Sequence, residues 1–285
     1  MASMIDIKRR KGSIQSTQQI TKAMKLVSTV KLQRAKSRAE QSKAYFTCMY
    51  ETVASMLAKT GYSDHKYLKA GTSPKKAVIV ITSNRGLAGG YNSNVIKLIT
   101  KGTLPKDDVV IYAVGKKGRD AFSRYGYEVK KDASDMIEEP QYPDALRLSN
   151  ELLEAYAAGE IGEIYLAYTA FKNTVSHEPT LLKLLPVEAG AQEDTKKADD
   201  IPMNFEPEDE RALDLIIPKY ITSLIYGGLV ESAASENGAR MQAMDSATSN
   251  AEEMIDSLTL LYNRARQSSI TQELTEIIAG AEAIS

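Results

Sequence analysis

Two long stretches near the ends of this 285-residue chain carry a helical pattern of hydrophobic and polar positions. Residues 13–60 and 239–279 contain neither glycine nor proline and are rich in residues that favour helix. In each stretch, apolar and small residues recur at alternating intervals of three and four. These residues are Leu32, Ala35, Ala39, Ser42, Phe46, Met49, Val53 and Met56 in the first stretch, and Met244, Ala247, Ala251, Met254, Leu258, Leu261, Ala265 and Ser268 in the second. Their length and spacing predict a coiled coil.

Alanine and serine occupy many of these spaced positions, which lets two helix backbones approach closely. Upstream of Leu32 the spacing changes to steps of four through Ile20, Met24 and Ser28, which predicts a local stutter. We expect the two ends of the chain to pair with each other. Two long helices of an ordinary bundle are the alternative.

The middle of the chain has a different pattern, in which short apolar runs alternate with helical ones. The apolar runs predict strands at residues 77–82, 108–114, 163–171 and 180–186, with a short one at 127–130. Helical patterns intervene at residues 93–101, 116–125 and 144–158. This alternation predicts βαβ units and a mostly parallel sheet, followed by a polar, acidic loop at 188–210.

The composition excludes several classes of protein. Hydrophobic residues make up 43% and charged residues 26%, as in soluble globular proteins. No run reaches the ~18 apolar residues that a membrane-spanning helix needs, since Asp214, Pro218 and Lys219 interrupt the longest one. A single cysteine, Cys48, excludes an intrachain disulfide, and two histidines leave little for a metal cluster. Because no apolar signal region follows the first residues, we expect a cytoplasm-facing location.

Charge is distributed unevenly along the chain. Residues 1–43 hold eleven Lys and Arg against two acids, a net charge of +9, whereas residues 188–214 have a net charge of −7. This asymmetry predicts two surfaces with different partners. A basic helix could follow nucleic-acid phosphates, but these charges fall on several helix faces and no aromatic residues lie between them. We therefore expect no nucleic acid as a partner.

A glycine-rich loop at residues 84–92 offers a different interpretation. It follows a predicted strand and precedes a predicted helix, where phosphate-binding loops lie. Its glycines, Gly86, Gly89 and Gly90, lack the Rossmann spacing, and no acid follows the next strand to bind a ribose. A dinucleotide-binding enzyme that uses the Gly86–Gly90 loop is thus the alternative function. His65, His177 and Cys48 form no arrangement that predicts catalysis.

Three segments carry a resemblance to a known family. They are residues 18–27 (QQITKAMKLV), 83–92 (SNRGLAGGYN) and 240–280, which includes RMQAMDSATSNA and LTLLYNRARQ. With them the chain resembles, from residue 1 to residue 285, the gamma subunit of F-type ATP synthases. The resemblance implies an α/β protein in which a long antiparallel coiled coil of both termini carries an inserted Rossmann-like α/β domain.

The resemblance also implies a function and partners. The gamma subunit is a rotor shaft that couples proton flow through a membrane c-ring to ATP synthesis or hydrolysis in a hexamer of alpha and beta subunits. It performs no chemistry itself, needs no cofactor or metal, meets the epsilon subunit and does not insert into the membrane. The location so implied is peripheral, at the cytoplasmic face of a bacterial plasma membrane.

The resemblance assigns contact residues as well. Residues implied to contact the beta subunit are Arg266, Gln267, Thr271, Glu273, Met24, Lys25, Lys8, Arg9 and Arg10. Residues implied to lie in an apolar sleeve at the tip are Ile277, Ile278 and Ile284. The expected segments are an amino-terminal coiled-coil helix at 1–60, the α/β domain at 75–187, the acidic loop at 188–210 and a carboxy-terminal coiled-coil helix at 211–285.

Overall fold

The computed structural model describes residues 4–60, 65–174, 176–187 and 209–282. Contacts group the chain into two compact units. Unit 1 comprises Met1–Ser28 and Arg240–Ser285, and unit 2 comprises Thr29–Ala239. Helices α1 (Met4–Thr60) and α5 (Asp209–Glu282) contribute to both units. The four expected segments stay a prediction, and most of the acidic loop at 188–210 lies outside the described residues.

The two long helices are far longer than those of ordinary domains. They contain 57 and 74 residues, or about 86 and about 111 Å at 1.5 Å per residue. Helix α5 begins well before the stretch without glycine and proline, and it includes Pro218. Packing accounts for this extension, because five of its residues at spacings of four are fully buried in unit 2. These residues are Leu213, Ile217, Ile221, Ile225 and Leu229.

Unit 2 contains a five-stranded sheet in the order β3-β2-β1-β4-β5. The strands are β1 (Lys76–Ile81), β2 (Val109–Val114), β3 (Glu128–Asp132), β4 (Glu163–Phe171) and β5 (His177–Leu185). The first four run parallel to their neighbours and β5 pairs antiparallel with β4. The connecting helices are α2 (Tyr91–Thr100), η1 (Lys106–Asp108), α3 (Lys116–Arg124), η2 (Ser134–Ile137) and α4 (Tyr142–Ala157). The predicted strand–helix alternation and Rossmann-like class are confirmed.

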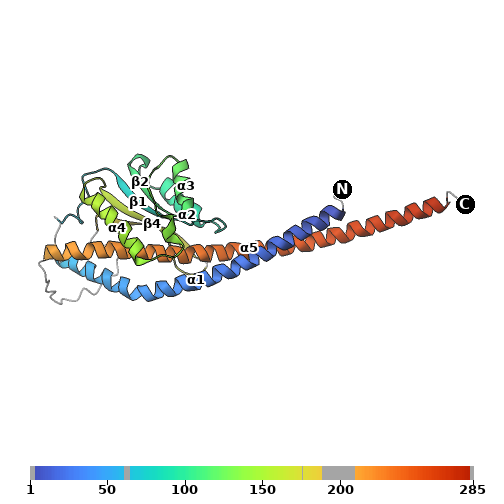
Figure 1. Ribbon diagram of the computed structural model, residues 1–285, viewed down its shortest axis with the longest axis horizontal. Coiled ribbons are helices and arrows are strands. Elements are labelled where there is room, and N and C mark those ends of the chain that lie inside the picture. Colours follow the sequence, from blue (N-terminus) through green and yellow to red (C-terminus); the bar gives the residue numbers. More distant parts are fainter. Residues whose placement is uncertain (1–3, 61–64, 175, 188–208, 283–285) are drawn as a thin grey trace. The chain divides into compact units, whose positions relative to one another are not determined.

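Both faces of the sheet are covered, which gives unit 2 three layers (Figure 1). On one face, Val78 and Val80 pack with residues of α2 and α3. On the other, Ile79 and Ile81 pack with α4, the carboxy-terminal part of α1 and the amino-terminal part of α5. Parts of both long helices therefore form one layer of the α/β unit.

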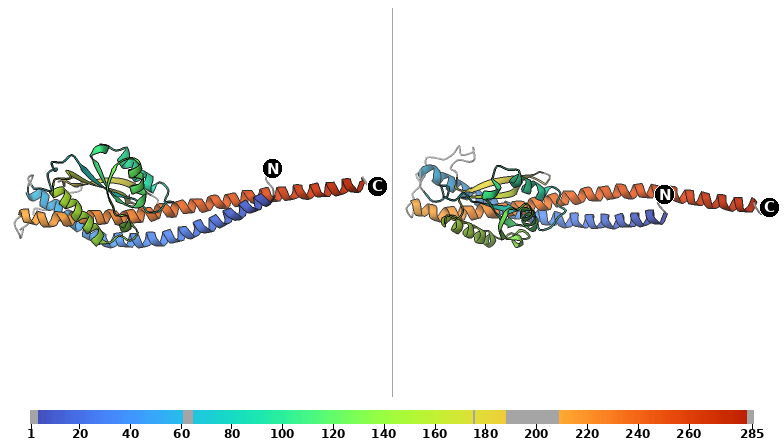
Figure 2. Two further views of the ribbon diagram at one scale, coloured as in Figure 1. Left: turned by 45° about the horizontal axis from the view of Figure 1, so that its top comes forward. Right: turned by 90° about the horizontal axis from the view of Figure 1, so that it is seen from above.

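In unit 1 the helices α1 and α5 pair antiparallel (Figures 1 and 2). Three side-chain contacts fix the register: Lys25 Nζ lies 2.6 Å from Asp245 Oδ1, Thr21 Oγ1 lies 2.8 Å from Thr248 Oγ1, and Gln18 Nε2 donates to Glu252 Oε1 at 3.0 Å. The predicted pairing of the two chain ends as a coiled coil is confirmed.

The phase predicted for part of the helical contact is wrong. Ile20 is 60% exposed, and the neighbouring Thr21 is buried against Thr248. Met254 and Leu261 are also at least half exposed, whereas their neighbours Ile255 and Tyr262 are partly buried. Alternating steps of three and four therefore continue through Thr21, and no stutter is needed there. A buried threonine hydroxyl pair hid this phase, because the prediction followed apolar residues.

Helix α5 is long and apolar enough to cross a membrane by length and composition alone. Half of its most apolar 18-residue window is buried inside the structure, however. The core helix of a soluble domain has the same character, so this feature is weak evidence for a membrane span.

Candidate functional site

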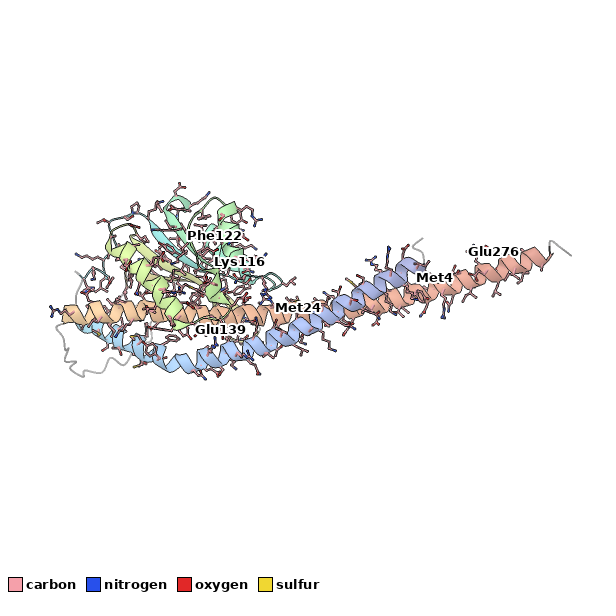
Figure 3. The ribbon with its side chains drawn as sticks, viewed as in Figure 1. Met4, Met24, Lys116, Phe122, Glu139 and Glu276 are labelled. Carbon is pink, nitrogen blue, oxygen red and sulfur yellow. The ribbon has the colours of Figure 1, made fainter. Side chains whose placement is uncertain are left out.

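The carboxy-terminal end of α5 extends past the end of α1 in unit 1. The register set by Thr21 with Thr248 and by Lys25 with Asp245 places Met4 close to Arg266. Figure 3 shows Glu276 on α5 beyond the position of Met4. From Ile270 to Ala281 every residue is exposed. Among the described residues, this end of α5 therefore has no helical partner.

The overhanging end of α5 is amphipathic although nothing described covers it. Ile270, Leu274, Ile277 and Ile278 are 48–67% exposed and follow the i, i+4, i+7, i+8 spacing of one helix face. Polar residues, among them Ser268, Gln272 and Glu276, lie on the opposite face. An exposed apolar face of this kind marks a surface for a protein partner.

Most carboxy-terminal residues implied by the family resemblance lie on this apolar face. Residues spaced by four, three and four share one side of a helix. Arg266, Ile270, Glu273 and Ile277 therefore form one stripe, and Gln267, Thr271, Leu274 and Ile278 form the adjacent stripe. The structure thus brings Arg266, Gln267, Thr271 and Glu273 together with Ile277 and Ile278, while Ile284 lies outside the described residues.

Two polar members of this face, Thr271 and Glu273, take part in hydrogen bonds within α5. Thr271 Oγ1 donates to the backbone oxygen of Gln267 at 2.9 Å, and Ser269 Oγ donates to Glu273 Oε1 at 3.3 Å. Arg266 and Gln267 are both exposed. Their guanidinium and amide groups can therefore donate to a carboxylate or a backbone carbonyl of a partner.

The amino-terminal residues that the family resemblance implies lie on different sides of α1. Consecutive residues on a helix lie about 100° apart, so Lys8, Arg9 and Arg10 point to three different sides of α1. All three are exposed, and Arg9 lies 3.4 Å from Asp6 in an ion pair one turn away. Lys25 pairs with Asp245 and is only partly exposed. Lys8, Arg9 and Arg10 therefore do not form a single contact patch.

A groove of about 400 Å³ runs between the two helices of unit 1. Arg10 and Ile14 line it from α1, and Met254, Leu258 and Leu261 line it from α5. The sequence pattern did not predict this groove, because it placed Met254 and Leu261 inside the helical contact. A second surface that the pattern missed is the exposed strip on α1 that contains Ile20 and Val27.

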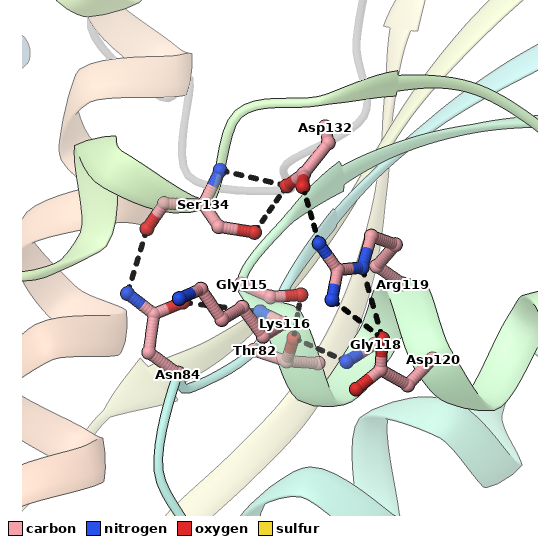
Figure 4. Close-up of polar contacts among 9 residues, drawn as sticks. All are labelled: Thr82, Asn84, Gly115, Lys116, Gly118, Arg119, Asp120, Asp132 and Ser134. Carbon is pink, nitrogen blue, oxygen red and sulfur yellow. Dashed lines mark hydrogen bonds and ion pairs between the residues drawn. The ribbon is translucent and has the colours of Figure 1, made fainter.

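The glycine-rich loop after β1 occupies the carboxyl edge of the sheet, where α/β proteins bind nucleotides. Asn84 extends across this edge (Figure 4), since its Nδ2 donates to the backbone oxygen of Ser134 at 2.8 Å and its Oδ1 accepts from the Lys116 backbone N–H at 3.1 Å. Leu87 at the tip is 63% exposed and has a positive φ of 64°.

The first turn of α3, which could bind a phosphate, already has protein partners. The Gly118 N–H donates to Thr82 Oγ1 at 2.9 Å, and the Lys117 N–H donates to the Ser83 backbone oxygen at 3.1 Å. A Cβ at Gly115, which has a φ of 117°, would lie 2.0 Å from the Thr82 backbone oxygen. These glycines therefore accommodate the end of β1, which accounts for them without a nucleotide.

Charged groups beside this turn form a closed cluster. Asp132 accepts hydrogen bonds from Ser134 and from Arg119 Nη1, the latter at 2.7 Å (Figure 4). The Ser134 hydroxyl, together with Arg119, lowers the pKa of the Asp132 carboxyl. Asp120 and Asp132 raise the pKa of the Arg119 guanidinium. All these groups have partners inside the chain, so the cluster stabilises the loop.

The two histidines have structural surroundings. His65 is buried, and its Nε2 lies 3.3 Å from Asp214 Oδ1 at the start of α5. Burial lowers the pKa of His177, whose ring packs against Gly238. Cys48 is exposed and free. No group of three or more His, Cys, Asp or Glu in the described part of the chain could hold a metal ion.

Comparisons with known proteins agree on one family. A family model described as ATP synthase matches residues 3–284. The chain is 65% identical to the ATP synthase gamma chain of Lachnoclostridium phytofermentans over 100% of both chains, and 46% identical to that of Alkaliphilus metalliredigens over 99% of this chain and 98% of the relative. It is 41% identical to the "ATP synthase gamma chain, sodium ion specific" of Acetobacterium woodii over 98% of each.

Solved structures show the same fold. A chain in the mitochondrial ATP synthase of Euglena gracilis superposes with a TM-score of 0.72 at 20% identity, covering 99% of this chain and 94% of that chain. A chain in the central stalk and c-ring of the Tetrahymena thermophila enzyme superposes with a TM-score of 0.59 at 24% identity, covering 80% of this chain and 99% of that chain. At these identities the likeness concerns the fold alone.

Proposed function

Because the chain belongs to the family of ATP synthase gamma chains, we propose that it is the central rotor shaft of that enzyme. Its partners are the alpha and beta subunits around the shaft, the epsilon subunit and the membrane c-ring. The chain is a non-catalytic subunit, and ATP is made or hydrolysed elsewhere in the complex. The proposed contact with the catalytic subunits rests on the exposed end of α5. One face of this end carries Arg266, Gln267, Thr271 and Glu273 beside exposed apolar residues.

The helical pair can act as a shaft because its sides differ chemically. One side of α5 presents Arg266, Gln267 and exposed apolar residues, and the opposite side presents small and polar ones. A partner shifts a conformational equilibrium only through its different affinity for the two states. As the shaft turns, each surrounding beta subunit meets a different side, so its conformational populations shift in sequence. Ion flow through the c-ring drives this rotation during synthesis, and hydrolysis reverses it.

The residues proposed to contact the beta subunit differ in how exposed they are and in the partners they already have within the chain. Arg266 and Gln267, with Thr271 and Glu273 a turn further on, form a continuous exposed set. Met24 and Lys25 are half-buried beside α5, and Lys25 also pairs with Asp245. Lys8, Arg9 and Arg10 supply positive charge on three sides of α1 and act at longer range.

An apolar sleeve is the proposed environment of the helix tip. Ile277 and Ile278 are 67% and 60% exposed in the isolated chain. Burying such side chains stabilises a complex by about 1.5–3 kcal/mol each. Ile284, which lies outside the described residues, is proposed as a further member of this contact.

The dinucleotide-binding alternative is not favoured. Asn84, which precedes the Gly86–Gly90 loop, forms hydrogen bonds across the edge of the sheet to Ser134 and Lys116. The first turn of α3 is likewise satisfied by Thr82 and Ser83.

The chain is part of a membrane-associated ATP synthase complex. We further propose that it lies at the cytoplasmic face of a bacterial plasma membrane, held there by its partners. Membership of the ATP synthase gamma chain family supports the membrane-associated part of this proposal. The coupling ion is proton or sodium, since one relative at 41% identity is named as sodium ion specific.

The test of the contact site is the double substitution Arg266→Ala with Gln267→Ala in the assembled complex. We expect ATP hydrolysis and synthesis to fall by about tenfold or more, because each lost charge-assisted hydrogen bond contributes about 1.5–3 kcal/mol. Turnover of the complex purified from its membranes is the measurement.

The matched control is Gln272→Ala, on the opposite side of the same helix. Gln272 Nε2 donates to Glu276 Oε1 of the same helix, at 3.0 Å, so its loss should leave turnover unchanged. Thermal unfolding of the isolated chain should be the same for all three proteins. Equal turnover of the double variant and the wild type would show that Arg266 and Gln267 are not contact residues.

A further inference from the structure

Strand β4 continues beyond the end of its neighbour β1. The pairing between them ends at Val80 with Ala167, whereas β4 runs on to Phe171. In a strand, the N–H groups of residues two apart point to the same side. Thr169 and Phe171 therefore extend the β1-facing side of β4 past the last residue that β1 can pair. A buried backbone group without a partner would cost about 1–3 kcal/mol.

Side chains of α5 take the place of the missing strand. Ser232 Oγ accepts a hydrogen bond from the Thr169 N–H at 3.2 Å, and Ser235 Oγ donates to the Thr169 backbone oxygen at 3.2 Å. Glu231 Oε2 accepts from the Phe171 N–H at 3.3 Å. Ser232 and Ser235 are fully buried. We call Glu231, Ser232 and Ser235 the strand-replacing set.

Two glycines bring the helix backbone against the sheet on either side of this set. A Cβ at Gly228 would lie 2.9 Å from Leu166 Cδ2, and a Cβ at Gly238 would lie 2.8 Å from His177 Cε1. Glycine inside a helix costs roughly 0.5–1 kcal/mol relative to alanine. Close approach explains both positions, because serine side chains are short and reach a strand backbone only from a near helix.

Apolar burial and hydrogen bonding hold α5 in different ways. The buried leucines and isoleucines of α5 resist its removal from unit 2, but hydrophobic attraction has no preferred direction. Hydrogen bonds weaken steeply when their angle or distance changes. The strand-replacing set therefore fixes the rotation of α5 about its own axis and its position along β4.

We propose that Glu231, Ser232 and Ser235 are positioning residues that transmit torque from the α/β unit to the shaft helix. This inference rests on the proposed rotor function. Helix α5 continues without interruption from this contact to Arg266 and Gln267. The set therefore fixes the rotation of the part of this helix that packs on β4, which is the part that the α/β unit turns. Without it, the helix slips within its apolar layer under load.

The test compares two activities of the complex reconstituted in vesicles. ATP hydrolysis reports the catalytic subunits, and ATP-driven ion uptake reports whether rotation reaches the c-ring. For Ser232→Ala with Ser235→Ala we expect ions transported per ATP hydrolysed to fall about threefold or more, with hydrolysis within about twofold of the wild type, because two directional bonds are lost.

Thr222→Val is the matched control, since Thr222 is also fully buried on α5 but its hydroxyl donates to the helix's own Pro218 oxygen at 2.8 Å. It should leave the transport ratio unchanged. An unchanged ratio in the double serine variant would overturn the proposal, whether both activities stay at the wild-type level or both fall equally. A wild-type complex that hydrolyses ATP without transport would instead contradict the rotor function.

A second pair of variants decides the matter if the serine variant does not assemble. Glu231→Gln keeps a side-chain oxygen that can accept from the Phe171 N–H, whereas Glu231→Leu has none. We expect the transport ratio to be normal in the glutamine variant and lowered in the leucine variant. Equal ratios in the two variants would overturn the proposal.

Discussion

At the scale of single residues, the contact between Gly115 and Thr82 shows how a missing side chain determines the end of a sheet. Gly115 has a φ of 117°, a conformation that other residues rarely adopt. A Cβ at Gly115 would collide with the Thr82 backbone oxygen. Thr82 Oγ1 accepts a hydrogen bond from the Gly118 N–H. Backbone and hydroxyl groups thus satisfy each other where a ligand would bind in a dinucleotide fold.

Gly115→Ala should therefore destabilise the α/β unit by about 3 kcal/mol or more, since backbone strain adds to overpacking. Gly86→Ala is the control, because a Cβ there would meet nothing within 4 Å. Its effect should stay within about 0.5 kcal/mol. Denaturant unfolding followed by circular dichroism measures both, and similar midpoints for the two variants would contradict the account.

The sequence predicts such residue-level contacts poorly. The glycine-rich loop and its position after a strand were visible, but Asn84 meets Ser134 across 50 positions and His65 meets Asp214 across a still longer separation. Only the folded sheet brings these residues together. Similarly, the polar Ser232 and Ser235 gave no signal, because the backbone groups they satisfy are left over from the unequal lengths of β1 and β4.

At the scale of elements, periodicity was most informative where packing follows it closely. Every strand run and intervening helix of the middle region is present. The signal is clearest for the central strands β1 and β2, which are buried on both faces and are continuous apolar runs. The paired helices were harder, since Ile20 and Thr21 differ by about 100° in direction and the less apolar of the two is buried. Hydroxyl pairs such as Thr21 with Thr248 make the helix phase ambiguous from sequence.

Glu231 gives the contact between α5 and β4 a pH dependence. Burial raises the pKa of this carboxyl above its ordinary value, although the Phe171 N–H opposes the shift. A raised pKa means that Glu231 contributes most to stability below the ordinary value of about 4.3, and that this contribution is lost as pH rises through the raised pKa. Glu231→Gln, which does not titrate, should therefore gain thermal stability relative to the wild type as pH rises from about 4 to 8.

Glu163→Gln provides a control of opposite sign. Burial alone would raise the pKa of the Glu163 carboxyl, but hydrogen bonds from Lys76, Tyr165 and Lys183 hold it below its ordinary value. Its stabilising contribution is present at neutral pH and lost as pH falls through the lowered pKa. The glutamine variant should thus be less stable than wild type at pH 7 and approach it in acid. Parallel pH profiles for the Glu231 and Glu163 variants would refute both assignments.

At the scale of the whole molecule, the chain separates what it needs for folding from what it presents to partners. The buried apolar residues of unit 2 hold the α/β layers together. In contrast, residues 270–281 are all exposed, yet they keep an apolar face. Solvent alone does not favour such a face, which is typical of a surface that a protein partner covers.

Replacing Ile270 and Leu274 by serine should therefore leave thermal unfolding of the isolated chain unchanged while weakening assembly with the alpha and beta subunits. Two apolar side chains lost from a buried contact correspond to about 3 kcal/mol, or roughly a hundredfold in affinity. Ser268→Ala with Gln272→Ala, on the opposite side, should assemble normally. Binding of the chain to the separated hexamer is the measurement, and equal affinities would argue against a buried apolar face.

The continuity of α1 and α5 between the two units also affects how the molecule folds. Thr21 and Thr248 are 227 positions apart, and joining such distant points in an unfolded chain costs considerable loop-closure entropy. Folding of unit 2 lowers that cost, because both helices pack in its core, α1 through Val53, Met56 and Leu57 and α5 through five residues from Leu213 to Leu229. Helical pairing can then begin near Ser28 and propagate toward Met4. Fraying therefore starts at Met4, and re-pairing recovers the correct alignment without a search.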